Sequence, residues 1–146
     1  MPSINLLITP QGALATLHVW ASLPKREAMK KEGQPIPNPV VAQFLIDTGA
    51  SCICVDPWII RELQLTPSGL IDIHTPSTTA NNAHACYQYD VALTILHLGV
   101  NRNFNAVPVL ESNVKHQGID GLMGRDVLSH CLFIYNGELN IHTLSF

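Results

Sequence analysis

The position best suited to chemistry is an aspartate in a turn of small residues. The run Val40–Ile46 is apolar, rich in β-branched and aromatic residues and without a helical stripe, so it predicts a buried strand. Asp47 follows directly, and a carboxylate at the end of a buried strand costs free energy unless something uses it. The residues that come next are all small: Thr48, Gly49, Ala50 and Ser51. Because a glycine lets a second backbone come close, the turn presents one carboxylate to whatever lies above it.

Asp47 has two interpretations. A turn aspartate commonly hydrogen-bonds its own backbone and does nothing else. The buried character of the preceding strand and a second segment, Gly118–Leu128, favour a chemical role. That segment predicts a strand that leads into a short helix over residues 125–130. Its strand ends with Leu122, Met123 and Gly124, and Arg125 begins the helix.

The two segments, in this order and with strand-like sequence between them, resemble the motifs of the retropepsin-like aspartic proteases, which are the retroviral protease and its cellular and bacterial relatives. In that family a strand that ends in Asp-Thr/Ser-Gly-Ala is followed later in the chain by two hydrophobic residues and a glycine that enter a short helix. Here the motifs are Asp47–Ala50 and Leu122–Gly124. The resemblance implies a mainly all-β fold with two short helices, a closed-barrel acid-protease half, in one domain over residues 1–146.

The resemblance also implies an aspartic endopeptidase that acts on a protein or peptide substrate. A pepsin-type mechanism needs two carboxylates, and this chain has one Asp-Thr-Gly, since neither Asp120 nor Asp126 has that setting. The second aspartate is therefore expected to be Asp47 of another copy in a homodimer. No metal and no cofactor are needed. The apolar lining expected for the cleft suggests hydrophobic residues beside the cut.

The other turn residues take supporting roles by resemblance. Thr48 would bond to its mate across the two-fold axis, Gly49 would admit the substrate backbone, and Ala50 leaves the dyad without an extra hydroxyl. Ser51 stands where many retroviral enzymes carry an aspartate that pairs with the arginine after the glycine. Arg125 is present without that partner, so it either pairs with another acid or is a solvated residue at the helix start.

The segment between the two motifs predicts a lid. Strands are expected over residues 70–74 and 85–96, around a small, polar tip. This is where the family places the flap, about residues 71–93, which folds over the cleft and excludes water. A plain surface hairpin is the alternative. The tip residues are Ser77, Thr78, Thr79, Ala80, Asn81 and Asn82.

Two predictions concern the N-terminal part. Residues 4–9 and 13–20 predict two strands joined as a hairpin by the turn Pro10–Gly12. The segment 22–39 contains four prolines and four basic residues, so it predicts an exposed, irregular loop that cannot pair in a sheet.

Two more concern later segments. Asp56-Pro57 predicts the N-cap and first residue of a helix that ends near Leu65. Asn136-Gly137 predicts a type I′ hairpin turn between strands over 132–135 and 138–144.

Composition excludes several other classes. Hydrophobic residues make up 47% of the sequence and charged residues 13%, which indicates a packed globule. The net charge of -3 gives no basic face, so nucleic-acid binding is not expected. No apolar run approaches the length of a membrane span, and the N-terminus lacks a positive n-region, so we expect neither a membrane segment nor a signal peptide.

The four cysteines have apolar surroundings and are too few for a disulfide framework, so we expect free thiols in a reducing cytoplasm. They are Cys52, Cys54, Cys86 and Cys131. An alternative is a zinc site, although its one-residue spacings are tighter than usual. Its ligands would be Cys52, Cys54, His84 and Cys86.

Three functions stay open at this stage. The first is the homodimeric endopeptidase. The second is a retropepsin-fold module that dimerises or binds peptides without proteolysis, for which the altered Ser51 position leaves room. The third is an unrelated β-rich protein with a thiolate metal site.

Overall fold

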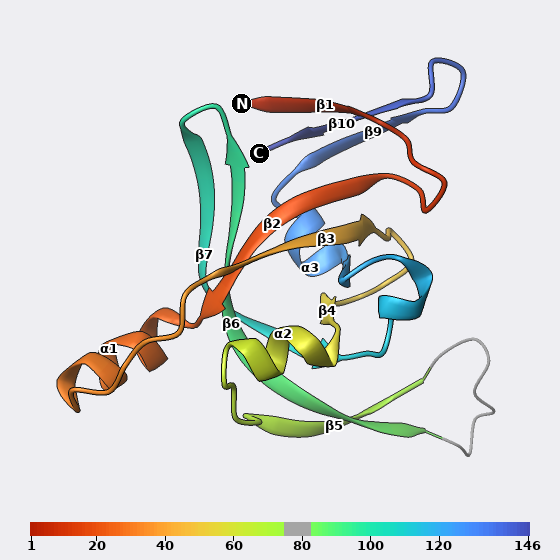
Figure 1. The fold of residues 1–146 in the computed structure, drawn as a ribbon. Helices are drawn as coiled ribbons and strands as arrows, with labels where there is room; N and C mark the ends of the chain where they lie inside the picture. The colour runs from red at the N-terminus through yellow and green to blue at the C-terminus, as the bar shows by residue number, and fades with distance from the viewer. Residues whose placement is uncertain (75–82) are drawn as a thin grey trace.

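Strands dominate the chain in the computed structural model, which describes residues 1–74 and 83–146 (Figure 1). The elements in chain order are β1 (Ser3–Leu7), β2 (Leu14–Ala21), α1 (Leu23–Lys31), β3 (Val40–Ile46), β4 (Cys54–Val55), α2 (Pro57–Glu62), β5 (Gly69–Ile73), β6 (His84–His97), β7 (Val100–Glu111), η1 (Lys115–Gln117), β8 (Gly121–Met123), α3 (Arg125–Leu128), β9 (Leu132–Asn136) and β10 (Ile141–Ser145). None of the helices among these described residues is long and apolar enough to cross a membrane.

Six strands close a barrel in the order β2-β3-β8-β4-β7-β6, because β2 pairs with both β3 and β6. β5 extends the sheet beyond β6. Alternation along β2 fixes the inside of the barrel: Leu17 and Val19 are fully buried, while His18 and Trp20, which alternate with them, are half-buried. The expected mainly β fold with a closed barrel is therefore confirmed.

The chain ends form a second sheet, in the order β1-β10-β9, and the two termini lie side by side (Figure 1). The predicted hairpin between the first two strands is wrong. Their turn closes with one bridge, between Thr9 and Gly12, and β1 then pairs antiparallel with β10. β2 pairs instead with β3 on one side, from Leu14 to Val19, and with β6 on the other, from Leu17 to Ala21.

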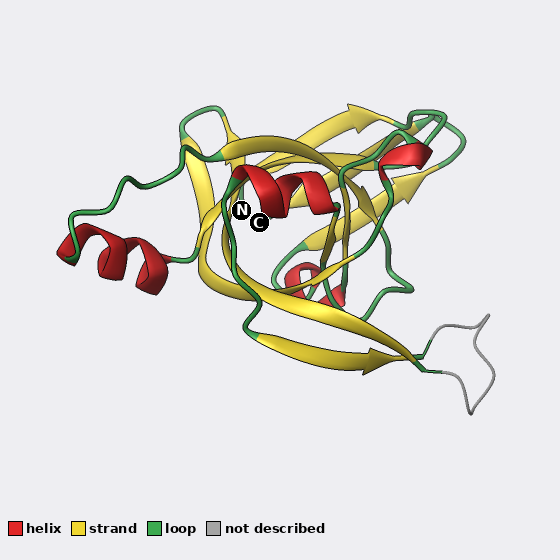
Figure 2. Cartoon of the chain, turned by 60° about the horizontal axis from the view of Figure 1, so that its bottom comes forward, coloured by secondary structure: helices red, strands yellow, loops and turns green. Residues whose placement is uncertain are grey.

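The predicted loop over residues 22–39 is also wrong in part, because α1 occupies its first half. Pro24 falls in the first turn, where a proline is tolerated, and the basic residues that follow are good helix formers. Gly33, with a φ of 66°, ends the helix in a Schellman motif in which Gln34 N donates to Met29 O. No residue of α1 is buried, and the helix projects from the barrel (Figures 1 and 2).

The two later predictions fare differently. α2 begins as expected, with Asp56 as N-cap and its side chain accepting from Trp58 N. β9 and β10 form the expected hairpin, but the type I′ turn is wrong. Four residues, 137–140, connect the strands, and the left-handed residue is Asn140, with a φ of 54°. Asn136 starts this wider turn by accepting from Leu139 N through its side chain.

Candidate active site

The two motifs lie next to each other. β3 runs parallel to β8, with Ile46 opposite Met123 in the register. The backbone N–H of Asp47 continues this ladder, donating to Met123 O at 3.0 Å. The parallel pairing therefore places the small-residue turn beside the Leu122–Gly124 segment, although the two are far apart in the sequence.

The carboxylate of Asp47 is held by its own turn. Its Oδ1 accepts hydrogen bonds from Gly49 N at 2.9 Å and Ala50 N at 3.3 Å. Oδ2 has no hydrogen-bond partner among the residues that the structure describes. Asp47 is half-buried and Thr48 is exposed. The two interpretations of Asp47 are therefore compatible. Its Oδ1 binds the backbone of the turn, and its Oδ2 makes no hydrogen bond with the described residues.

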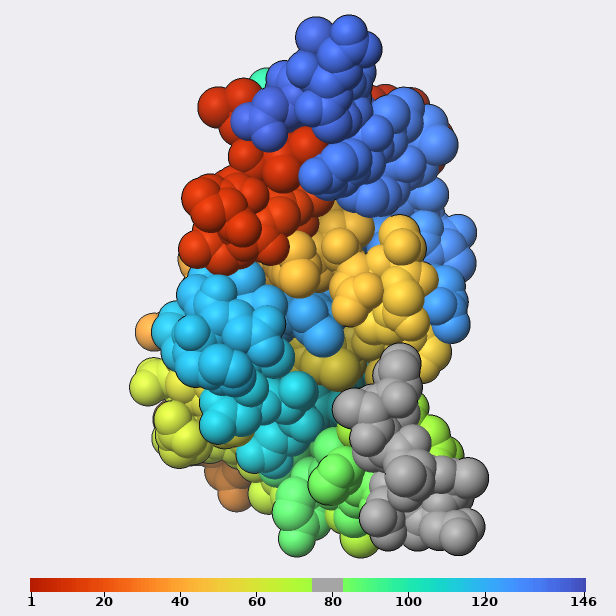
Figure 3. Space-filling view, turned by 90° about the vertical axis from the view of Figure 1, so that its right-hand side faces the viewer, coloured from red at the N-terminus to blue at the C-terminus, as the bar shows by residue number. Residues whose placement is uncertain are grey.

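The turn opens onto a hollow of about 440 Å³. Its lining combines the turn with β4, with β8 and with the ends of β5 and β7: Asp47, Gly49, Ala50, Ser51, Cys52, Cys54, Ile73, His74, Leu110, Glu111, Ser112 and Leu122. Figure 3 shows this side of the molecule, where the yellow segment of the turn reaches the surface beside the blue C-terminal part. One free carboxylate oxygen at the edge of a partly apolar hollow can activate a water against a bound ligand.

A family model described as aspartyl protease matches residues 33–127, which is more than half of the chain. The chain belongs to the aspartyl protease family. The matched segment includes the Asp47 turn and ends within α3, so it covers both motifs. No curated protein matches the chain in sequence.

A solved structure agrees with the fold. The crystal structure of a retropepsin-like aspartic protease from Rickettsia conorii is similar over 99% of this chain and 91% of that one, with a TM-score of 0.60. The sequence identity is 16%, so this likeness bears on the fold alone. The expected relation to the retropepsin-like proteases is thus confirmed.

Arg125 resolves a question that this aspartyl protease sequence leaves open. Its Nη1 donates to Thr48 O at 2.9 Å and Gly49 O at 3.2 Å, and its backbone N donates to Ala50 O. Arg125 has no acidic partner among the described residues. The guanidinium therefore binds the carbonyls of the Asp47 turn directly. Neither of the two predictions for Arg125, an acidic partner or a solvated position, included this contact.

Asp126 supports the same segment from the other side. Its Oδ2 accepts from Ile53 N at 3.0 Å, and its Oδ1 accepts from Val127 N. The sequence analysis gave this residue no role. The signal available was an acidic residue in the first turn of a helix that follows a glycine, where spare carboxylate oxygens can accept backbone N–H groups.

Two glycines let the segments approach. A Cβ on Gly124 would lie 2.5 Å from the carbonyl carbon and oxygen of Cys52. A Cβ on Gly121 would overlap with Cys54 O and with the ring of Phe44. Added bulk at Gly124 would therefore clash with the backbone just after the turn.

The thiols gather near the hollow. Cys52 and Cys54 line it, and Cys86 is close enough to interact electrostatically with them, because its charge would act on Cys54 and that of Cys52 would act on Cys86. Burial, then the neighbouring thiols, raises the pKa of Cys54 to about 12. All four cysteines are unpaired, and no group of three metal-binding side chains occurs in the described part of the chain. The zinc alternative therefore has no support from this geometry.

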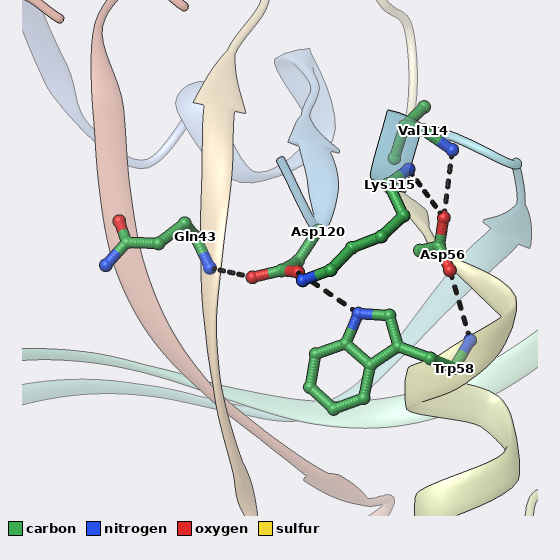
Figure 4. Close-up of polar contacts among 6 residues, drawn as sticks. All are labelled: Gln43, Asp56, Trp58, Val114, Lys115 and Asp120. Atoms are coloured by element: carbon green, nitrogen blue, oxygen red, sulfur yellow. Dashed lines mark hydrogen bonds and ion pairs between the residues drawn. The ribbon is translucent and has the colours of Figure 1, made fainter. Parts of the chain in front are cut away.

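A polar network supports the strand that carries Asp47 (Figure 4). Asp120 accepts from Gln43 N on β3 at 2.8 Å, from Trp58 Nε1 at 3.1 Å and from the Lys115 ammonium. Asp56 accepts from Trp58 N and from the backbone N–H groups of Val114 and Lys115. Burial acts to raise the pKa of Asp120, but its hydrogen bonds with Gln43, Lys115 and Trp58 hold the pKa below its ordinary value. The carboxylates of Asp56 and Asp120 therefore serve to hold these segments together and are not available for chemistry.

The predicted flap is described only at its base. β5 and the start of β6 form an antiparallel pair, from Gly69 opposite Gln88 to Ile73 opposite His84. The predicted tip residues 77–82 lie outside the described residues. His74, at the end of this base, lines the hollow with Asp47.

Proposed function

We propose that the chain is an aspartic endopeptidase that works as a homodimer, with the Asp47 carboxylates of two copies sharing one proton. The observation that carries this proposal is the Asp47 turn itself. One carboxylate oxygen is fixed by two backbone N–H groups, the other has no hydrogen-bond partner among the described residues, and Asp47 lines a hollow large enough for a side chain. Membership of the aspartyl protease family supports the reaction class.

The shared proton follows from electrostatics. Two carboxylates about 3 Å apart repel by roughly 5 kcal/mol at an effective dielectric constant near 20, so one of them stays protonated over a broad pH range. The ionised carboxylate takes a proton from a water held between them, and the protonated one donates to the carbonyl oxygen of the peptide. The resulting tetrahedral diol then collapses and releases the amine. This sequence of steps forms no covalent bond to the enzyme.

A second copy is supported by the terminal sheet. β1 and β9 are its outer strands, so each has one edge without a strand partner among the described residues. Three side chains that share its outer face are exposed: Leu7 (69%), Leu132 (52%) and Ile134 (49%). Open strand edges with apolar neighbours favour pairing with another chain.

The test is cleavage of an unfolded protein substrate between pH 3 and pH 8, because a carboxylate pair can titrate across that span. Wild type and Asp47→Asn are compared, each with its mass from sedimentation and its circular dichroism spectrum. We expect a dimeric wild type that cleaves, and a folded, dimeric Asp47→Asn variant that does not.

Cleavage that survives in Asp47→Asn would overturn the mechanism. A folded wild-type dimer that binds peptides without cleaving any would favour the non-proteolytic peptide-binding module instead. Activity from a protein that stays monomeric at every concentration would contradict the shared dyad.

A further inference from the structure

A second acidic residue lines the same hollow as Asp47. Glu111 is the last residue of β7 and lies opposite Val55 of β4 in a parallel register. The lining of the hollow also includes three large apolar side chains, Ile73, Leu110 and Leu122. The hollow thus joins an acid to apolar surface within one space of about 440 Å³.

The carboxylate of Glu111 is held in place by a buried tyrosine. Tyr89 Oη donates to Glu111 Oε2 at 3.1 Å, and Tyr89 is only 6% exposed, so its ring cannot swing away. Burial and then the charge of Glu111 raise the pKa of Tyr89. Burial and then the same charge raise the pKa of Cys86, which lies near the hollow-lining Cys52. The Glu111 carboxylate therefore acts on Cys86 as well as on Tyr89, which holds it in place.

In the described part of the chain, no lysine or arginine forms an ion pair with Glu111. The ion pair found in the described part of the chain joins Lys115 to Asp120. Residues 75–82 contain no Lys, Arg or His in the sequence. Among the lining residues, His74 is the one side chain that can carry a positive charge, and Asp47 adds a second acid. The hollow therefore has acidic groups in excess of basic ones.

We propose that Glu111 selects substrates that carry a lysine or arginine beside the scissile bond. This inference rests on the proposed endopeptidase function and names its substrate class. A lysine or arginine suits the site because its apolar stem can lie along the leucine and isoleucine walls while its charged head reaches a fixed carboxylate. This departs from the purely hydrophobic preference expected from an apolar cleft.

The first test is a cleavage profile. Wild type, Glu111→Gln and Glu111→Lys digest the same pool of peptides, and mass spectrometry identifies the cut sites. In wild type we expect Lys or Arg to be enriched about tenfold over Gln at one position beside the cut, the factor of one charge-assisted hydrogen bond. Glu111→Gln should remove that enrichment, and Glu111→Lys should replace it with a preference for Glu or Asp. Glu138→Gln, an exposed residue of the β9–β10 turn, is the control that should keep the wild-type profile.

The second test does not need catalysis. Folded Asp47→Asn is titrated with three fluorescent peptides that differ only in one Lys, Gln or Glu, and the anisotropy gives their affinities. We expect the Lys peptide to bind about tenfold more tightly than the Gln peptide, and this ratio to vanish in Asp47→Asn with Glu111→Gln.

The outcomes separate the two claims. If wild type cleaves but its profile is flat, or its basic preference survives Glu111→Gln, the inference about Glu111 is wrong while the protease function stands. If wild type cleaves nothing, the proposed function fails, and the binding ratio alone decides on Glu111. Equal affinities for the three peptides would overturn the inference in either case.

Discussion

The Asp47 turn and the terminal sheet differ in how completely one copy of the chain satisfies them. The turn is held on every side: Met123 O accepts from its first N–H, Arg125 binds its carbonyls, and Asp126 binds the strand that follows. The terminal sheet exposes Leu132 and Ile134. The comparison shows that the contacts of the Asp47 turn are complete within one chain, whereas the terminal sheet leaves apolar side chains exposed.

Buried polar atoms sharpen the contrast. Beneath the turn, Asp56 and Asp120 have several partners each (Figure 4). In the terminal sheet, His142 is only 1% exposed, yet neither ring nitrogen makes a hydrogen bond of good geometry with the described residues. It faces a space of about 200 Å³ with Leu6 and Leu14. The buried carboxylates beneath the turn are thus fixed by hydrogen bonds, whereas the His142 imidazole in the terminal sheet has no hydrogen-bond partner among the described residues.

Breaking the packing behind the turn should have the largest effect. Gly124→Ala places a methyl group against the backbone of Cys52, which cannot move without displacing the turn. We expect a loss of about 3 kcal/mol in the free energy of unfolding, the upper end for overpacking. Urea denaturation measures this. Gly69→Ala is the matched control, because nothing lies closer than 3.9 Å to its Cβ, and a similar loss there would contradict the argument.

Breaking the network beneath the turn should cost less. Asp120→Asn removes a charge that accepts three hydrogen bonds, so we expect the unfolding free energy at pH 7 to fall by about 2 kcal/mol. The lowered pKa of Asp120 fixes the sign of the pH dependence. Its contribution is complete above the unfolded value near 3.9 and is lost as the pH falls through the folded value.

Urea denaturation between pH 2 and pH 7 checks this. Part of the acid loss seen in wild type should be missing in Asp120→Asn. Asp72→Asn, at an exposed position of β5, should keep the whole loss. A wild-type acid limb that is unchanged in Asp120→Asn would count against the network as its source.

The terminal sheet should show a smaller pH effect, which comes from a buried base and not from a buried acid. Burial lowers the pKa of His142 from 6.5, and the nearby backbone of Leu14 only partly offsets this. The unfolded chain therefore takes up a proton first as the pH falls, and stability decreases below about pH 6.5 by at most about 1.4 kcal/mol per pH unit. On the strands that flank His142, the titratable residue opposite it in the register is Tyr135. Among the described residues, no acidic one lines the space of about 200 Å³ that His142 faces.

His142→Leu should flatten this limb of the stability curve, while His116→Gln, at an exposed position, should leave it in place. Unfolding free energies between pH 5 and pH 8 measure both. A limb that persists in His142→Leu would place the titrating group elsewhere, and the contrast between the two regions would then weaken.

The sequence predicted what is local and missed what depends on distant partners. The sequence singled out Asp47 and Gly124 because a strand, a turn and a glycine leave signals within a few residues of each other, and the structure brings their two segments together. The partner of β1 was missed, since its pairing with β10 joins opposite ends of the chain. Glu111 drew no prediction because a single glutamate at the end of a strand has no pattern, and the fold brings it to the hollow that Asp47 lines.

The error over residues 22–39 has a different cause. The prolines were given more weight than the helix-forming residues between Pro24 and Pro35, although a proline in the first turn of a helix costs little. The contacts of Arg125 were beyond sequence reasoning, because backbone carbonyls as partners leave no trace in residue types.

The projecting helix α1 offers a practical handle on the molecule. None of its residues is buried, and its far end at Gly33 has open space around it. Loop tips of this kind accept insertions and are cut first by added proteases, because little packing depends on them. A tag or fluorophore placed there would report on the protein without burdening the barrel, the hollow or the chain ends.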